Sequence, residues 1–332
     1  MTAEWINNGL WAKNKNKFKE LIEIDINERK DNIINIIDNT NLVTNDGEII
    51  NLHDDIKESI AKTIIKSEAE QTVKELQKKE EYKKYISAKT DFQNCISENF
   101  GSFYFNFYNS ISPTLERQYK FRFIYLCTYL KYNDNRLMHK QENGLYKLYK
   151  AGDLMELLRL SERETRNTKK TLIENDLIKI DADKNIIVND KISFVGDITK
   201  GDKRSYTRIF KESIQELYKN SLPREHKLLG LLVDLLPLIN FKFNIICYNP
   251  NCELIEDLQP LSLKDISEYF KLYTGKNITS LKNKLLKIKV NIQDAIMYME
   301  RDGMKAFVVN PSIYYKGNNI NDLNYLIDLF RI

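Results

Sequence analysis

One stretch of the chain carries several hydrogen-bond donors at helical spacing. These donors are Arg163 and the residues three, four and seven positions after it, namely Arg166, Asn167 and Lys170. This spacing places all four side chains on one face of a helix. Arginine can pair with guanine and asparagine with adenine in the major groove of a duplex, whereas lysine suits phosphate. The chemistry that these residues offer is recognition of a nucleic acid.

A second stretch is more strongly basic. Residues 271–289 contain six lysines and no acidic residue. Because a solvated helix usually mixes charges of both signs, this run favours contact with a polyanion over a merely exposed face, which stays open as the alternative. The residues predicted to face outward here are Lys276, Ser280, Asn283, Lys284 and Lys287.

Motifs for catalysis are absent from the sequence. Residues 275–277 do not form a phosphate-binding loop, and no G-x-S-x-G is present. The three histidines, His53, His139 and His226, are far apart, so no metal-binding pair can be drawn. His226 opens an apolar segment and is expected to pack or cap. The sequence therefore predicts a protein that is not an enzyme and uses no metal or other cofactor.

Composition places the chain in a broad class. No apolar run approaches the roughly 20 residues that span a bilayer, so no membrane contact is expected. The four cysteines form no C-x-x-C pair, which favours the reducing cytoplasm. Residues 1–118 contain 16 basic and 20 acidic residues and are therefore mildly acidic. Residues 119–200 contain 16 basic and 12 acidic residues, and residues 201–332 contain 19 basic and 15 acidic residues, so both later segments are mildly basic. The later segments suit a nucleic-acid partner.

The elements that would position the first basic face follow a recognisable order. A buried helix over 119–132 precedes a short helix over 152–158. Ser161 and Glu164 fit a capping box that starts a helix ending near 175, with Thr165, Thr168 and Leu172 facing inward. A hairpin over 177–189 follows. This is the layout of a winged helix, a variant of the helix-turn-helix.

The same layout recurs later in the chain. Residues 187–197 align without gaps to residues 308–318, an offset of 121. Such self-similarity indicates two copies of one module. The second copy is predicted to contain helices over 226–239, 263–270 and 276–288 and strands over 292–299 and 305–310, with an inward stripe of Ile278, Leu281, Leu285 and Ile288.

Further contacts with DNA are predicted outside the two helices. Lys184 tips the first hairpin, where an ordinary exposed turn residue is the alternative, and Arg301 and Lys305 flank the tip of the second. Arg204 and Arg208 lie in the segment joining the modules and could hold the backbone between two contact sites.

Within the first 118 residues, the segment 1–90 is predicted to be helical with one interruption. A hairpin is expected over 42–50 and a long helix over 54–88, which either forms a dimer arm or packs on its own domain. Alternating aromatics over 103–108 indicate a strand, either buried in a sheet or able to stack bases.

The residues 306–318 resemble the C-terminal ending of RepL-type plasmid replication proteins, with Asn310, Pro311 and Gly317 at the matching positions. The resemblance implies origin or operator binding and recruitment of host replication proteins, in plasmid or phage initiators of low-GC Gram-positive hosts. The predicted fold is mainly α with small β wings (α+β). It has a helical region over 1–118 and two tandem winged-helix domains over 119–200 and 201–332.

The predicted function is sequence-specific binding of double-stranded DNA in replication initiation or maintenance of a plasmid or phage. A transcriptional regulator using the same modules is the first alternative. A scaffold whose modules bind protein is the second.

Overall fold

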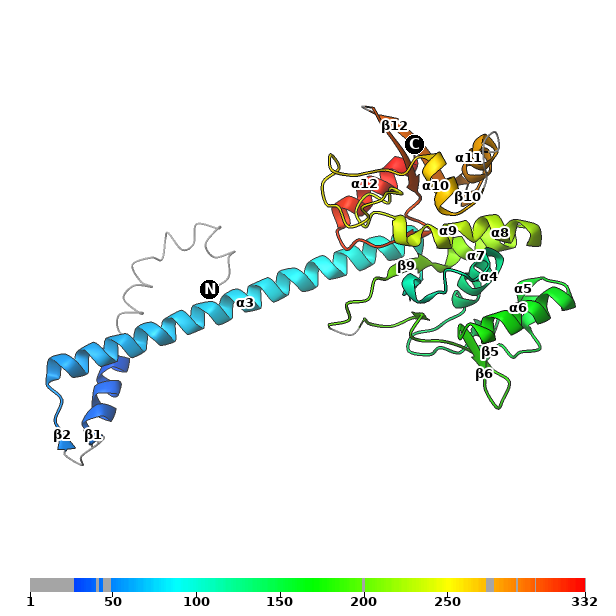
Figure 1. The fold of residues 1–332 in the computed structure, drawn as a ribbon. Helices are drawn as coiled ribbons and strands as arrows, with labels where there is room; N and C mark the ends of the chain where they lie inside the picture. Colours follow the sequence, from blue (N-terminus) through cyan, green and yellow to red (C-terminus); the bar gives the residue numbers. More distant parts are fainter. Residues whose placement is uncertain are drawn as a thin grey trace. The chain divides into compact units, whose positions relative to one another are not determined.

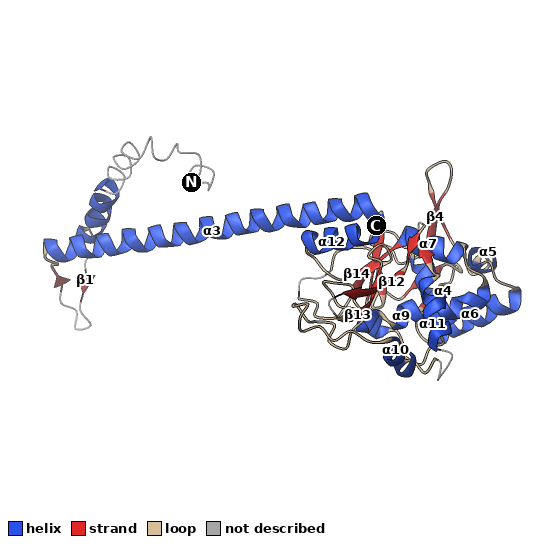
Figure 2. Cartoon of the chain, turned by 90° about the horizontal axis from the view of Figure 1, so that it is seen from above, coloured by secondary structure: helices blue, strands red, loops and turns tan. Residues whose placement is uncertain are grey.

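The computed structural model describes residues 27–39, 42–43, 49–198, 201–272, 278–290, 292–301 and 303–331. The chain divides into two units, residues 1–90 and residues 91–332 (Figure 1). Helices and small antiparallel sheets are mixed, in agreement with the predicted α+β class (Figure 2). The predicted boundaries at 118 and 200 both lie inside the second unit, so the two segments predicted as separate domains share one unit.

The first unit contains a helix over residues 27–38, a hairpin and most of a long helix. Lys30 and Glu58 form an ion pair of 2.7 Å between the two helices. The long helix continues past the predicted end at 88, because no glycine or proline interrupts it before Gly101. The labelled elements are β1 (Leu42–Val43), β2 (Ile49–Ile50), which pairs antiparallel with β1, and α3 (Asp54–Phe100).

The first half of the second unit follows the predicted order, with an added hairpin. The aromatic strand is present and buried, with Tyr104 fully covered, so it belongs to a sheet interior rather than to a base-stacking surface. The elements are β3 (Phe103–Asn106), η1 (Tyr108–Ser110), α4 (Arg117–Cys127), β4 (Met138–Lys140), β5 (Tyr146–Leu148), α5 (Leu154–Leu158), α6 (Glu162–Glu174), β6 (Ile178–Ile180), β7 (Ile186–Val188) and β8 (Ser193–Phe194).

The second half departs from prediction at its first helix. The segment 226–239 forms three short helices instead of one, and two of them meet at Gly230. The elements are β9 (Thr207–Phe210), α7 (Lys211–Lys219), η2 (Pro223–Glu225), α8 (His226–Leu229), α9 (Leu231–Asp234), η3 (Leu236–Leu238), α10 (Leu263–Tyr269), α11 (Ile278–Leu286), β10 (Lys289–Val290), β11 (Gln293–Asp294), β12 (Ile296–Arg301), β13 (Met304–Val309), β14 (Tyr314–Tyr315) and α12 (Ile320–Arg331).

Gly230 allows α8 to approach α4 closely. A Cβ at this position would lie 2.1 Å from the backbone oxygen of Arg117, a distance that no other residue tolerates. The two halves therefore pack helix to helix through backbone contact, and they share one continuous hydrophobic core.

Four strands from distant parts of the second unit form its central sheet. The order is β14-β9-β3-β8, and every neighbouring pair is antiparallel. Phe194 of β8 pairs with Phe105 of β3, whereas Tyr315 of β14 pairs with Arg208 of β9. Tyr315 lies 121 residues after Phe194, so the offset found in the sequence recurs in the strand register.

The same turn precedes β8 and β14. Asn189 Nδ2 donates to the carbonyl oxygen of Asp176 at 2.9 Å, and Asn310 Nδ2 donates to that of Asp294 at 3.0 Å. In each case Oδ1 accepts from the backbone N–H two residues further on, at 3.0 and 2.9 Å. The two asparagines are 121 residues apart, and their side chains make equivalent hydrogen bonds that stabilise the turn in each half.

A third segment is held against each hairpin in the same way. Asn135 Nδ2 donates to the carbonyl oxygens of Val188 and Ser193, both at 3.1 Å. Asn244 Nδ2 donates to the carbonyl oxygens of Val309 at 3.1 Å and Tyr314 at 3.0 Å, each 121 residues after its counterpart in the first half. Bridges beside each asparagine extend β6–β7 and β12–β13 by one short strand segment. The repeat therefore extends to the segments that precede α5 and α10.

One lysine in each half, the buried Lys211 and the half-buried Lys316, contacts a carbonyl oxygen after the first helical segment of that half. Lys211 Nζ donates to the carbonyl oxygen of Leu130 at 2.6 Å, and Lys316 Nζ donates to that of Ile239 at 3.0 Å. Burial lowers the pKa of Lys211 to about 8 and that of Lys316 to about 7. The ammonium groups satisfy carbonyls that a helix end leaves without partners.

Candidate nucleic-acid interface

Helix α6 presents the predicted polar face to solvent. Ser161 Oγ accepts from the backbone N–H of Glu164 at 3.3 Å and caps the helix start. The predicted inward residues, Thr165, Thr168 and Leu172, are buried. The outward residues Arg163, Arg166, Asn167 and Lys170 are exposed.

Two ion pairs moderate the charge of this face. Arg166 pairs with Glu162 at 2.7 Å and Lys170 pairs with Glu174 at 3.8 Å, and all four side chains are more than half exposed. Exposed pairs of this kind contribute roughly 0–1 kcal/mol, so a phosphate can displace them.

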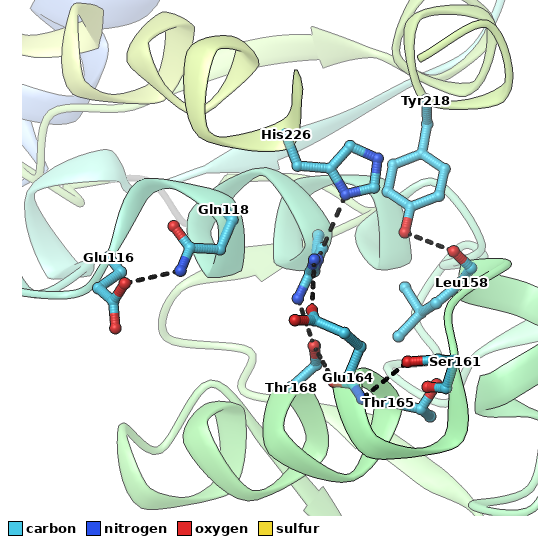
Figure 3. A network of polar contacts seen from close by, with 10 residues as sticks. Glu116, Gln118, Leu158, Ser161, Glu164, Thr165, Thr168, Tyr218 and His226 are labelled. Atoms are coloured by element: carbon cyan, nitrogen blue, oxygen red, sulfur yellow. Dashed lines mark hydrogen bonds and ion pairs between the residues drawn. The ribbon is translucent and has the colours of Figure 1, made fainter. Parts of the chain in front are cut away.

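The buried guanidinium of Arg122 anchors α6 from inside through Glu164 and Thr168, two α6 residues that Figure 3 labels. Its Nη1 donates to Thr168 Oγ1 at 2.8 Å, and its Nη2 forms an ion pair with Glu164 at 2.8 Å. The predicted capping box is therefore only half present, because the carboxylate of Glu164 turns to Arg122 instead of the N-cap amide. This arrangement fixes the rotation of α6 about its axis and so determines which side chains face solvent.

His226 completes this buried network. Its Nδ1 accepts from Arg122 Nε at 3.3 Å, and its ring lies 4.5 Å from that of Tyr218. Burial, together with the neighbouring guanidinium of Arg122, lowers the pKa of His226 to about 4. The imidazole is therefore neutral at physiological pH, in line with the predicted packing role.

Helix α11 carries the second predicted face. Leu281, Leu285 and Ile288 are buried as predicted. Lys282 Nζ lies 3.8 Å from the centroid of the Tyr298 ring, which fastens the helix to β12. The predicted outward residues Ser280, Asn283, Lys284 and Lys287 are exposed, whereas Lys276 and the side chain of Ile278 lie outside the described residues.

The predicted contact residues of the two hairpins are Lys184 in the first and Arg301 and Lys305 in the second. Lys184 is exposed at the turn between β6 and β7, with a left-handed φ of 66°. Lys305 is exposed on β13 and pairs with Glu300 at 3.2 Å. The side chain of Arg301 lies outside the described residues.

The segment joining the two halves is not a free connection. Arg208 lies in β9 and is 8% exposed, with its guanidinium donating to the carbonyl oxygen of Gly317 at 2.8 Å and to Asn318 Oδ1 at 2.6 Å. The prediction that Arg208 contacts the DNA backbone is therefore wrong, because β9 is an interior strand. Arg204 is exposed, but Asp202 and the ring of Phe107, 3.7 Å away, hold it in place.

No family model, curated protein or solved structure matches the chain. Within the described ranges no cluster of side chains could hold a metal ion. Among the helices in those same ranges, none is both long enough and apolar enough to cross a bilayer. The function of the chain is therefore inferred from the geometry of the second unit.

Sequence reasoning missed a basic hairpin beside the first predicted wing. Strands β4 and β5 are partly exposed and pair around a turn containing Asn143-Gly144, a dipeptide typical of hairpins. Lys131 Nζ lies 4.5 Å from the centroid of the exposed Tyr146 ring. The backbone N–H of Ala151 donates to the carbonyl oxygen of Lys184, which joins this hairpin to the tip of the β6–β7 hairpin. Residues 131–150 contain five basic and two acidic residues.

The corresponding stretch of the second half has the opposite charge. Residues 248–259 connect the segment beside β13 to α10 and contain three acidic and no basic residues. Leu254 and Ile255 are exposed within it. The two halves thus share their hydrogen-bonding framework but differ in the insertion that precedes α5 and α10.

Proposed function

We propose that residues 91–332 bind double-stranded DNA through two units of winged-helix type, with α6 and α11 as the helices that enter the major groove. Each helix buries one face against the core and exposes polar, donor-bearing side chains on the other, as a recognition helix requires. The observation that carries the proposal is the repeated framework of hydrogen bonds, which gives both halves the same helix, helix and hairpin order.

The β4–β5 hairpin is proposed as an additional contact. Its base lies beside the tip of the β6–β7 hairpin, where Lys150 bridges to Asn185, the neighbour of Lys184. Short basic hairpins suit phosphate or the minor groove, and the exposed Leu145 and Tyr146 add apolar surface that can lie against sugars. The acidic insertion of the second half lacks this property, so α11 and the β12–β13 hairpin act without such an extension.

The experiment is a titration of labelled duplex fragments with the full chain, by fluorescence anisotropy at several salt concentrations. Arg163→Ala plus Lys170→Ala, and separately Lys284→Ala plus Lys287→Ala, are expected to weaken binding. Each is expected to lower the log–log salt slope by about 0.9 for every phosphate that the variant no longer neutralises. Lys66→Ala plus Lys78→Ala on α3 is the matched control, because these lysines are also exposed but lie in the first unit.

The outcomes separate the alternatives. An unchanged salt slope in both test variants would refute α6 and α11 as contact helices. Absence of any binding at low salt would remove the DNA proposal and favour the scaffold that binds protein. For the hairpin, Lys140→Ala plus Lys147→Ala is expected to lower the slope, and an unchanged slope would exclude it alone.

Within DNA binding, we propose replication initiation or maintenance of a mobile element. The support is the resemblance around Asn310, Pro311 and Gly317. Asn310 builds the turn before β14, and a Cβ on Gly317 would lie 2.4 Å from the hydroxyl of Tyr315, so both residues have structural reasons to be present. The test is supply of the chain in trans to a plasmid that carries an origin but no initiator. Failure to support replication, with a change in reporter transcription, would favour the transcriptional regulator.

A further inference from the structure

A cavity of about 440 Å³ lies between α4, α9, η3 and the end of α10. It is distant in sequence from the α6 face, and the proposed DNA contacts do not use it. Its volume is in the range of roughly 300–1,000 Å³ that is usual for small-molecule sites. Its walls come from both halves of the second unit, since Tyr108 and Arg117 belong to the first half and Asp234 and Tyr269 to the second.

The polar wall of the cavity has more positive than negative charge. Arg117 Nε and Lys120 Nζ contact the two oxygens of one carboxylate, that of Asp234, at 2.6 and 2.7 Å. The exposed fractions of these three side chains are 19, 6 and 9%. Two largely buried cations therefore share one anion, and an exposed lysine, Lys271, adds further positive charge at the rim. Burial of unbalanced charge is costly, so an anionic ligand would be stabilised here.

The remaining walls are aromatic. Tyr108, Tyr269 and Phe270 line the cavity, and the last two rings lie 4.9 Å apart at 69°. Lys316 Nζ lies 4.4 Å from the centroid of the Tyr108 ring. Aromatic rings bind flat, conjugated groups by stacking. A ligand with both an anionic group and an aromatic group would therefore bind here more tightly than an anion alone.

We propose that this cavity is a binding site for a nucleoside monophosphate, with the phosphate toward Arg117 and Lys120 and the base against Tyr269. A nucleotide combines the two properties that the walls select, one anionic group and one aromatic system. Since the end of α10 forms a wall and α10 packs against α11, an occupied cavity would also restrain α11.

The test is calorimetric titration of the full chain, without DNA, with AMP, GMP, CMP and UMP, and with inorganic phosphate and adenosine as the two half-ligands. At least one nucleotide is expected to bind with a dissociation constant below 1 mM and at least tenfold more tightly than either half-ligand. Absence of binding by all four nucleotides would overturn the proposal. Equal affinity for a nucleotide and for phosphate would overturn the aromatic part and leave a simple anion site.

Two variants keep the test independent of folding. Tyr269 is 59% exposed, so Tyr269→Ala should preserve the fold, weaken nucleotide binding about tenfold and leave phosphate binding unchanged. Tyr325→Ala on α12, at 53% exposed, is the matched control and should bind like the natural chain. Equal affinity in both variants would remove Tyr269 from the site. Because no DNA is present, these results are distinguishable from a failure of the proposed DNA binding.

Discussion

The protonation of His226 provides a direct measure of how strongly the interior holds α6. The imidazole is 1% exposed, and its Nδ1 accepts from Arg122 Nε, which requires a neutral ring. Protonation would remove this acceptor and place a second cation beside Arg122. This is why burial and the guanidinium lower the pKa of His226 to about 4.

The magnitude follows from linkage. A histidine in the unfolded chain has a pKa of about 6.5, and each unit of difference corresponds to about 1.4 kcal/mol. Because the folded pKa is the lower one, the unfolded chain binds more protons between pH 4 and 6.5. The stabilisation is therefore complete above pH 6.5 and is lost as the pH falls toward 4. At pH 5, the second unit should have lost about 2 kcal/mol of its free energy of unfolding relative to pH 7.5.

The assay is urea unfolding of the natural chain and of His226→Asn at pH 7.5, 6 and 5. The asparagine Oδ1 can replace Nδ1 as an acceptor for Arg122 but does not titrate in this range. The natural chain should lose about 2 kcal/mol more than the variant between pH 7.5 and 5, because contributions from other groups are common to both. Parallel losses in the two proteins would refute the reasoning.

Three further perturbations test the framework around the site. Arg122→Met should lower the free energy of unfolding by about 3 kcal/mol because it leaves buried partners unmatched, whereas the exposed Arg163→Met should change it by less than about 0.5 kcal/mol in urea titrations. Gly317→Ala should cost roughly 1–3 kcal/mol through overpacking, but Gly152→Ala, which meets open space, should be nearly neutral in thermal unfolding. Burial lowers the pKa of Lys316 to about 7, below that of an unfolded lysine, so the unfolded chain binds more protons above pH 7. The urea midpoint should therefore rise from pH 7.5 to 9.5, and this rise should be smaller in Lys316→Met.

Local signals in the sequence predicted the local elements. Ser161 begins α6 because a serine side chain satisfies a free amide wherever a helix starts, and that requires no distant partner. The buried stripe of Leu281 and Leu285 follows from helical periodicity alone. The 121-residue offset was visible because the turn around Asn189 and Asn310 needs the same residue type in both copies.

Long-range partners were the part that the sequence did not reveal. The carboxylate of Glu164 is bound by Arg122, which lies 42 residues earlier, so a local capping rule assigned it the wrong partner. Arg208 was predicted to be exposed because nothing in its neighbourhood shows that β9 lies between β3 and β14. The β4–β5 hairpin had a usable signal in Asn143-Gly144, but no strand was predicted between the helices over 119–132 and 152–158.

The shared core determines what the two proposed recognition helices can do together. Two DNA-binding modules joined by a flexible linker can adjust the distance between them. Their combined affinity then depends on the effective concentration of the second module at its site once the first is bound. Here β3 and β9 pair in one sheet, and Gly230 brings α8 against the backbone of α4, so α6 and α11 belong to a single packed body. Their separation is therefore a property of the fold. If it matches the geometry of one duplex, substitutions in α6 and in α11 will each weaken binding to the same DNA fragment. If it does not match, only one of the two helices will affect the affinity for that fragment.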